Sequence, residues 1–124
     1  MNSQELLENY GKAANVVKDF YLAKFLESME SEDLPENFKE FAKEQGIDND
    51  TVAKMIEAMP RALFDVFDVN EIYINVTAFR NGLFLYSIIS DVKEEVGSEE
   101  TSNTRKEAEK LAIEEAFKIL NEKL

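Results

Sequence analysis

The spacing of hydrophobic residues changes once along this chain, near residues 68–70, and this change limits the fold more than any other feature. Before it, apolar residues recur every three or four positions, as on one side of a helix. From Ile72 onward they recur at every second position, as a strand requires. The pattern predicts an α+β fold in one domain, with a helical part at about 1–68 and a hairpin-helix part at about 69–124.

Three or four N-terminal helices are expected. Ser3 can cap a first helix that runs to about Glu30. A second helix is predicted at 35–46, a third is capped by Asp48, and a short fourth starts at Pro60. The apolar stripe of the first helix consists of Leu7, Tyr10, Ala14, Val17, Tyr21 and Phe25.

Asn81-Gly82 predicts the turn of a β-hairpin, because this dipeptide favours a two-residue loop in which both residues take positive φ. A two-residue loop pairs Phe79 with Phe84 and gives the hairpin two unlike faces. The aliphatic face is Ile72, Ile74, Val76, Leu85 and Ile89; the aromatic face is Tyr73, Phe79, Phe84 and Tyr86, with Ile88. We expect helices to cover at least one face, and the other to be covered too or open to a partner.

A long C-terminal helix is predicted to pack on this hairpin. It begins at a capping box, Thr104 with Glu107 three residues later. A stripe of small residues at one-turn spacing lets it lie close to the strands. The stripe is Ala108, Ala112 and Ala116. The preceding segment, 93–103, contains four glutamates and is predicted to be a mobile acidic loop.

The residue types that are absent exclude most familiar enzyme chemistry. The 124 residues include no Cys and no His. Disulfides, thiolate nucleophiles, Cys-ligated zinc and Ser-His triads are therefore excluded, and the commonest general base is missing. We expect no enzyme activity and assign no catalytic residue, metal or cofactor.

Two weaker candidates for chemistry remain. Glu115 and Asp91 lie beside apolar residues, where the pKa of a carboxyl can rise. Residues 48–50 offer oxygen ligands for a hard cation, but Ala53 and Met59 occupy the positions where a calcium loop needs Gly and Glu. The ordinary interpretations are helix-edge carboxylates and helix capping.

The net charge of −12 points to the class of partner. It repels nucleic-acid phosphates and anionic lipid and attracts basic surfaces, although acidity also simply favours solubility. The N-terminus lacks a secretory pattern, and no apolar run approaches the roughly 20 residues that span a bilayer. We therefore expect a cytoplasmic protein that binds neither membrane nor nucleic acid directly, and whose partner is a protein with a basic surface.

The start of the last helix carries one suggestive motif. Residues 104–112, T-R-K-E-A-E-K-L-A, open a helix behind a hairpin and resemble the last helix of double-stranded-RNA-binding domains. Arg105 and Lys106 match two of the positions with which that family grips phosphates. Glu109 stands in place of a third lysine, the preceding loop is acidic, and two strands are predicted instead of three. The resemblance implies an RNA-binding domain as one alternative.

A broader group of motifs spans the chain from about Phe38 to Leu124. It comprises segments 64–74, 104–109 and 116–120, with the short hairpin between them. Together they resemble short uncharacterised acidic proteins encoded by bacteriophages and prophages. The resemblance implies a setting in which small acidic proteins inhibit host machinery, including CRISPR nucleases whose nucleic-acid channels they occupy.

An inhibitor of this kind offers ordered carboxylates in place of a phosphate backbone. The expected function is therefore a non-catalytic acidic protein-binding module, a phage-derived inhibitor of a host defence nuclease. Its predicted contacts are one acidic cluster at Glu27, Glu30, Glu32, Asp33 and Glu36, a second at Glu94, Glu95, Glu99 and Glu100, and the aromatic residues Tyr73, Phe79, Phe84 and Tyr86. The alternative is an adaptor or homo-oligomeric structural protein, such as a homodimer, that pairs through the aromatic hairpin face. The ordinary interpretation of the two acidic clusters is solvated turns, and that of the aromatic residues is core packing.

Overall fold

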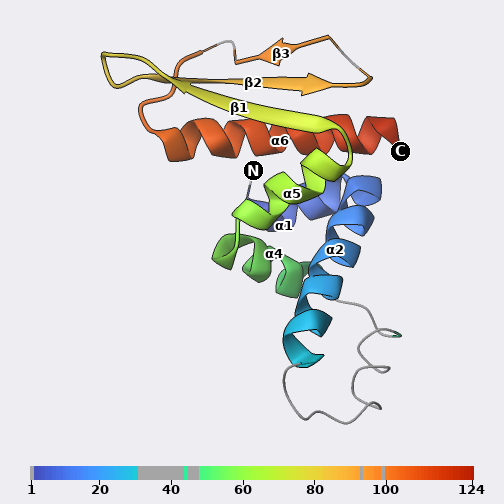
Figure 1. Cartoon of the computed structure of the whole chain (residues 1–124). Helices are drawn as coiled ribbons and strands as arrows, with labels where there is room; N and C mark the ends of the chain where they lie inside the picture. Colours follow the sequence, from blue (N-terminus) through green and yellow to red (C-terminus); the bar gives the residue numbers. More distant parts are fainter. Residues whose placement is uncertain (1, 31–43, 45–47, 93, 99) are drawn as a thin grey trace. The chain divides into compact units, whose positions relative to one another are not determined.

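A computed structural model describes the chain at residues 2–30, 44, 48–92, 94–98 and 100–124 (Figure 1). These residues form helices and an antiparallel sheet, which confirms the predicted α+β class. They fall into two compact units, Met1–Val66 and Phe67–Leu124, and the boundary lies close to the predicted change of pattern. The helix predicted at 35–46 lies, except for residue 44, outside the described residues.

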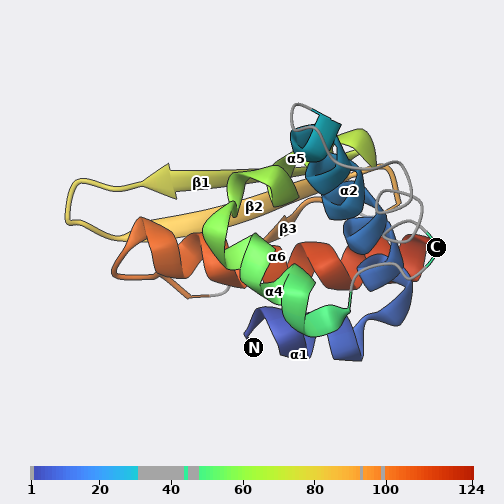
Figure 2. The ribbon, with the colours of Figure 1, turned by 90° about the horizontal axis from the view of Figure 1, so that it is seen from below.

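The first unit is built from α1 (Ser3–Asn9), α2 (Gly11–Glu30) and α4 (Asn49–Ala58), followed by α5 (Arg61–Val69), which crosses into the second unit. Helix α1 contacts both α2 and α4 (Figure 2). Among the side chains that the structure describes in these three helices, the buried ones are Leu6, Leu7, Ala13, Ala14, Val17, Tyr21, Val52, Ala53 and Ile56. They include four members of the predicted stripe, whereas Phe25 is exposed.

The single long helix predicted for the N-terminus is instead two helices. Asn2, not Ser3, caps α1: its side chain accepts the Glu5 N–H at 2.8 Å, and the Glu5 carboxylate accepts the Asn2 N–H at 3.5 Å. The backbone leaves the helix at Tyr10 (φ −121°, ψ 69°), and α2 begins at Gly11. A break is cheap here because glycine is a poor helix former. The apolar spacing continues across the break and so hides it.

The predicted start of α4 is confirmed. The Asp48 carboxylate accepts the Thr51 N–H at 2.7 Å. Hydrogen bonds from Thr51, first from its side chain and then from its backbone N–H, lower the pKa of Asp48. Helix α5 follows Pro60 as predicted. The Tyr21 hydroxyl donates to the Met59 carbonyl at 2.8 Å and so fastens α2 to the end of α4.

The second unit contains three antiparallel strands in the order β1-β2-β3. Their bounds are β1 (Ile72–Ala78), β2 (Phe84–Ser90) and β3 (Val96–Gly97). Helix α6 (Arg105–Lys123) runs along one face of this sheet and packs on β1 and β2, as predicted (Figure 1). The alanine stripe of α6 is fully buried.

The hairpin register differs by one residue from the prediction. The Phe79 N–H donates to the Leu83 carbonyl at 2.9 Å, and the Gly82 N–H donates to the Phe79 carbonyl at 3.1 Å. Only Gly82 of the loop residues takes positive φ, at 76°. This is a three-residue loop closed by a left-handed glycine, so Ala78, instead of Phe79, lies opposite Phe84.

A shift of one residue redistributes the side chains between the two faces of a sheet. The face toward α6 carries Ile72, Ile74, Val76, Ala78, Phe84, Tyr86, Ile88 and Ser90. The outer face carries Tyr73, Asn75, Thr77, Phe79, Leu83, Leu85, Ser87 and Ile89. The prediction of one aliphatic and one aromatic face is therefore wrong, because each face holds both kinds of residue and the outer face also holds polar ones.

The segment predicted as a mobile acidic loop contains β3, which pairs with the middle of β2. Beside it, the Ser98 N–H donates to the Tyr86 carbonyl at 3.0 Å, and the Ser98 hydroxyl oxygen accepts the Tyr86 N–H at 3.2 Å. Farther along, Phe84 and Ser102 exchange backbone hydrogen bonds of 2.9 and 2.8 Å. The prediction of two strands and a disordered loop is thus wrong. The sequence did not reveal β3 because a strand of two residues is too short to show the alternation of apolar and polar residues.

Lys123, in the last turn of α6, ties the helix to the open end of the hairpin. Its ammonium donates to the Asn70 carbonyl and, at 2.8 Å, to the Asp91 carboxylate. The hydrogen bond from Lys123 lowers the pKa of Asp91. Asp91 is therefore no candidate for a carboxyl of raised pKa, because the ammonium stabilises its charged form.

This contact predicts an acid-sensitive contribution to stability. Because the pKa of Asp91 is lower in the folded protein, its contribution is complete above the unfolded pKa of 3.8 and is lost as pH falls through the folded pKa. Urea unfolding between pH 5 and pH 2 should show a smaller loss of stability for Asp91→Asn than for the wild type. Asp19→Asn, an exposed change on α2, should follow the wild type; identical slopes for all three proteins would contradict the argument.

Candidate protein-binding site

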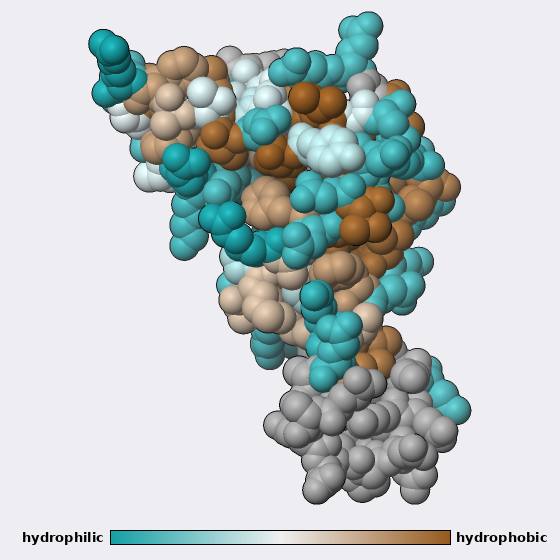
Figure 3. Space-filling view, viewed as in Figure 1, coloured by the Kyte–Doolittle hydropathy of each residue, from teal (hydrophilic) through white to brown (hydrophobic). Residues whose placement is uncertain are grey.

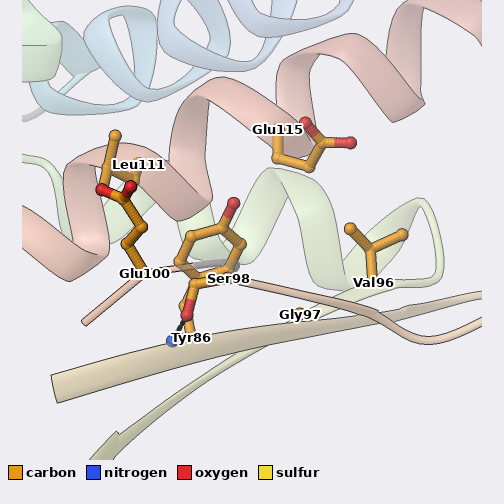
Figure 4. Close-up of a pocket in the computed structure, with 7 residues that line it drawn as sticks. All are labelled: Tyr86, Val96, Gly97, Ser98, Glu100, Leu111 and Glu115. Atoms are coloured by element: carbon orange, nitrogen blue, oxygen red, sulfur yellow. Dashed lines mark hydrogen bonds between the residues drawn. The ribbon is translucent and has the colours of Figure 1, made fainter. Parts of the chain in front are cut away.

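A pocket of about 370 Å³ lies within the second unit, between β3 and α6. We call it the β3–α6 pocket. Its lining residues are Tyr86 from β2, Val96, Gly97, Ser98 and Glu100 from β3 and the segment after it, and Leu111 and Glu115 from α6 (Figure 4). Two of them, Tyr86 and Glu100, are predicted contact residues, so the structure brings an acidic and an aromatic prediction together.

The sheet register places Tyr86 in this pocket. Cross-strand partners share a face, and Tyr86 lies on the side of β2 that faces α6. Both hydrogen bonds between its backbone and Ser98 hold this part of β2 against the segment that follows β3. In Figure 4 the Tyr86 ring rises from the strand toward α6, with the Glu100 side chain on one side and Glu115 on the other.

The position of Glu100 follows from the pairing of the segment after β3, which has more residues than the part of β2 opposite it. Ser98 is hydrogen-bonded to Tyr86, and Ser102 is hydrogen-bonded to Phe84. Between these two contacts the chain advances four residues after β3 but only two residues along β2. Such an excess makes a strand bulge away from its partner. Glu100 lies within it and is exposed.

Helix α6 supplies the opposite wall of the pocket. Leu111 and Glu115 are one turn apart and therefore share a side of the helix. Leu111 is 44% exposed, and Glu115 is half-buried. The sequence singled out Glu115 only as a neighbour of buried alanines, and it gave no signal for Leu111 or Ser98 as pocket residues.

This set of side chains suits a cation with an aliphatic stem. Two carboxylates can accept hydrogen bonds from a guanidinium or an ammonium group. An aromatic ring attracts such a cation through its negative face, and Leu111 offers apolar surface to the methylene groups. The pocket can therefore hold an arginine or lysine side chain.

The other predicted contacts that the structure describes belong to several different elements. Glu27 is exposed on α2, and Glu94 and Glu95 are exposed just before β3. The side chain of Glu30, and residues Glu32, Asp33, Glu36 and Glu99, lie outside what the structure describes. Tyr73 and Phe79 are exposed on the outer face of the sheet, whereas Phe84 and Tyr86 are half-buried on the opposite face. The four aromatic residues therefore form no common surface.

Helix α6 carries the basic residues on which the RNA-binding resemblance depends, and two further lysines that interrupt its acidic residues. Arg105 stacks over the Phe84 ring, with its guanidinium carbon 5.4 Å from the ring centroid, and Lys106 is exposed. Lys110 and Lys118 lie between the glutamates of α6, so no continuous acidic surface runs along this helix. The first turn of α6 is held by the Thr104 hydroxyl oxygen, which accepts the Glu107 N–H at 3.1 Å.

Residues 48–50 act as a helix cap in the structure. Asp48 accepts the Thr51 N–H, and Asp50 pairs with Lys54 at 3.2 Å. Across the described ranges, no group of three or more acidic side chains is placed to hold a metal ion. Within the same ranges, no helix combines the length and apolar character that crossing a bilayer requires.

Comparisons with known proteins add no family to these observations. No protein-family model matches the chain, and neither a curated protein nor a solved structure matches it.

Proposed function

We propose that the protein is a non-catalytic acidic protein-binding module, and that the β3–α6 pocket holds an arginine or lysine side chain of a basic partner. The observation that carries this proposal is the convergence of Tyr86, Glu100 and Glu115 on one pocket. The net charge of −12 steers a basic surface toward the protein over distances greater than any single contact. The pocket then fixes one basic side chain in place.

The expected affinity comes from a few strong contacts. A hydrogen bond to a charged group contributes about 1.5–3 kcal/mol when it is well formed. A cation over an aromatic ring adds about 0.5–2 kcal/mol, depending on how much water is removed. Glu94 and Glu95, exposed before β3, extend the negative potential beside the pocket. Together these terms favour a peptide segment with several basic residues.

The partner class that we propose is a host defence nuclease, in the setting that the phage resemblance implies. A nucleic-acid channel is lined with Lys and Arg, and a protein that occupies it excludes the nucleic acid. Because lysines interrupt the glutamates of α6, the contact that we propose is centred on the pocket instead of on an acidic helix face. DNA cleavage by purified CRISPR nucleases, tested in turn, would reveal such inhibition.

A nona-arginine peptide is the direct probe of the pocket. Combining Glu100→Gln with Glu115→Gln should weaken its binding at least tenfold, because the loss of one charge-assisted hydrogen bond exceeds about 1.4 kcal/mol. The matched control is Glu8→Gln with Glu57→Gln, two exposed positions in the first unit with the same change of net charge. Fluorescence anisotropy should place this control within about twofold of the wild type, since neither carboxylate lines the pocket and exposed charges are screened by salt.

Equal weakening by both double variants would reduce the interaction to general electrostatics and remove the pocket from the proposal. Tyr86→Leu separates the aromatic contribution from that of the carboxylates. It keeps an apolar side chain at a half-buried position and should still weaken binding, because it removes the ring face. Circular dichroism of each variant checks that the fold is retained.

Binding of double-stranded RNA is the second candidate function. The third strand, β3, favours it, because the RNA-binding resemblance requires three strands ahead of the last helix. The substitution of Glu109 for a lysine and the acidic segment before α6 weigh against phosphate contacts. A gel-shift assay with a 20-base-pair RNA tests it: a complex that Lys106→Glu abolishes would favour this candidate over the acidic module.

A further inference from the structure

Strand β1 forms one edge of the sheet, because the strand order is β1-β2-β3. The Phe79 N–H donates to the Leu83 carbonyl, and hydrogen-bonded positions alternate along an antiparallel pair. Odd-numbered residues of β1 therefore bond to β2. The backbone groups that point to the outer edge belong to Ile72, Ile74, Val76 and Ala78. Within the described part of the chain, no hydrogen bond joins these groups to another segment.

This edge lacks the features that usually prevent edge strands from pairing. Natural edge strands are often short, or carry lysine, proline or a bulge. Residues 72–79 contain no charged residue, no proline and no glycine, and the register of β1 against β2 is uninterrupted. In a chain with 26 acidic and 14 basic residues, uncharged stretches of this length occur only in the hairpin, and β1 is its edge strand. The accessible part of this edge, residues 74–78, is a ready surface for another strand.

We propose that two copies of the protein pair through their β1 edges, antiparallel, across a twofold axis at Asn75. This register places Ile74 opposite Val76 of the second copy on both sides of the axis, as a symmetric interface requires. Ile72 is fully buried, so the pairing that we propose rests on the outward backbone groups of Ile74 and Val76. The two three-stranded sheets become one continuous sheet.

The charge distribution favours a second copy over a basic partner. Each copy carries a net charge of −12, so self-association needs a contact surface without charge, and the β1 edge supplies one. A basic partner gains nothing from an uncharged strand. The contact that we propose is also distinct from pairing through an aromatic face, because it uses backbone groups at the edge of the sheet.

The side chains support the same register. On the outer face, Tyr73 lies opposite Thr77 of the second copy, and Asn75 lies opposite its own equivalent, where two amides can exchange hydrogen bonds. Tyr73 is 46% exposed and gains a cross-strand neighbour. Figure 3 shows hydrophobic residues interspersed among hydrophilic ones on the visible face of the second unit. On the other face, Ile74 meets Val76 of the second copy and extends the apolar layer beneath the sheet.

Cysteine cross-linking tests the register directly, because the chain contains no cysteine. Residues at a position that is not hydrogen-bonded have Cα atoms about 4.5 Å apart, within the range of about 4.4–6.8 Å that a disulfide spans. Asn75→Cys should therefore form a covalent dimer under mild oxidation. Thr77→Cys alone should not, because its equivalent is displaced by four residues, about 13 Å along the strand.

A mixture of Thr77→Cys and Tyr73→Cys should form a mixed dimer, because the register places these positions opposite each other. All three positions are exposed on the outer face, so accessibility does not distinguish them. Equal cross-linking of Asn75→Cys and Thr77→Cys, or none by either, would overturn the proposal. The outcome is independent of the β3–α6 pocket, because the pocket lies beside β3, at the other edge of the sheet from β1.

A charge at the edge provides the second test. Asn75→Lys places two like charges directly opposite each other across the twofold axis, which disfavours pairing. Ser87→Lys puts the same charge on the same face but on β2, away from the edge, and should keep the dimer. Sedimentation at low and high salt should show a wild-type dimer that persists in high salt, and at least a tenfold weaker dimer for Asn75→Lys only. A monomeric wild type at both salt concentrations would contradict the proposal.

Discussion

Replacing Phe117 with alanine is expected to lower the free energy of unfolding by about 3–5 kcal/mol, one of the two largest single-site effects that we predict. The Phe117 side chain is fully buried on α6. Its ring meets the Phe67 ring edge to face, with centroids 5.7 Å apart and planes at 81°. Truncation leaves a cavity that the sheet and helix cannot fill without moving. Urea unfolding monitored by circular dichroism measures the loss.

Matched variants separate packing from a general effect of truncation. Phe117→Leu keeps most of the volume and should cost less than the alanine variant, about 1–2 kcal/mol. Leu111→Ala removes a large side chain from the same helix at a position 44% exposed, and should cost less than about 1 kcal/mol. A double-mutant cycle with Phe67→Ala should show a coupling of about 0.5–1.5 kcal/mol for the ring pair. A Leu111→Ala loss as large as that of Phe117→Ala would contradict the burial argument.

The features of the fold that depend on local sequence were predictable. Asp48 and Thr104 cap α4 and α6, because a cap needs only a side-chain oxygen and an N–H three residues later. The Glu107 carboxylate nevertheless accepts the Asn103 N–H, at 3.3 Å, so the details of the second cap differ from those of a capping box. The change of spacing near residue 68 likewise identified the switch from helices to strands.

The hairpin register was not predictable from its turn. Asn81-Gly82 is compatible with a loop of two residues or of three, since a left-handed glycine occurs in both. The loop that forms places Phe84, Tyr86 and Ile88 toward α6. That choice is made by packing against a helix far along the chain, which the dipeptide cannot encode.

The candidate site was predictable only in part, for the same reason. Glu100 stood out because it belongs to a run of glutamates, and Tyr86 because it belongs to a strand rich in aromatic residues. Their meeting with Glu115 depends on the pairing of β3 with β2 and on the position of α6, which are contacts between distant segments. A two-residue strand leaves no periodic signal, so the pocket that it helps to form is invisible in the sequence.

Tyr21→Ala is the second substitution with a large expected effect, about 3–5 kcal/mol of stability, and it concerns the first unit. Tyr21 is fully buried, and its hydroxyl donates to the Met59 carbonyl at 2.8 Å. Tyr21→Phe keeps the ring but leaves this carbonyl without the hydroxyl, which should cost about 1–2 kcal/mol. Urea unfolding at pH 7 of the two variants therefore divides the effect into packing and hydrogen bonding; equal losses would assign all of it to the hydroxyl.

The ionisation of Tyr21 gives this prediction a pH dependence. Burial, and then the negative charge of Asp65, raise the pKa of Tyr21 above its unfolded value of 10.0. Because the folded protein keeps the phenol neutral, the stability from this group is complete below pH 10 and falls as pH rises above 10, where the unfolded chain ionises. The wild type should therefore lose part of its advantage over Tyr21→Phe between pH 9 and pH 11. The other tyrosines are common to both proteins, so their ionisation cancels in the difference between the two free energies of unfolding. If this difference stayed constant from pH 9 to pH 11, the environment of Tyr21 would not disfavour its charged form.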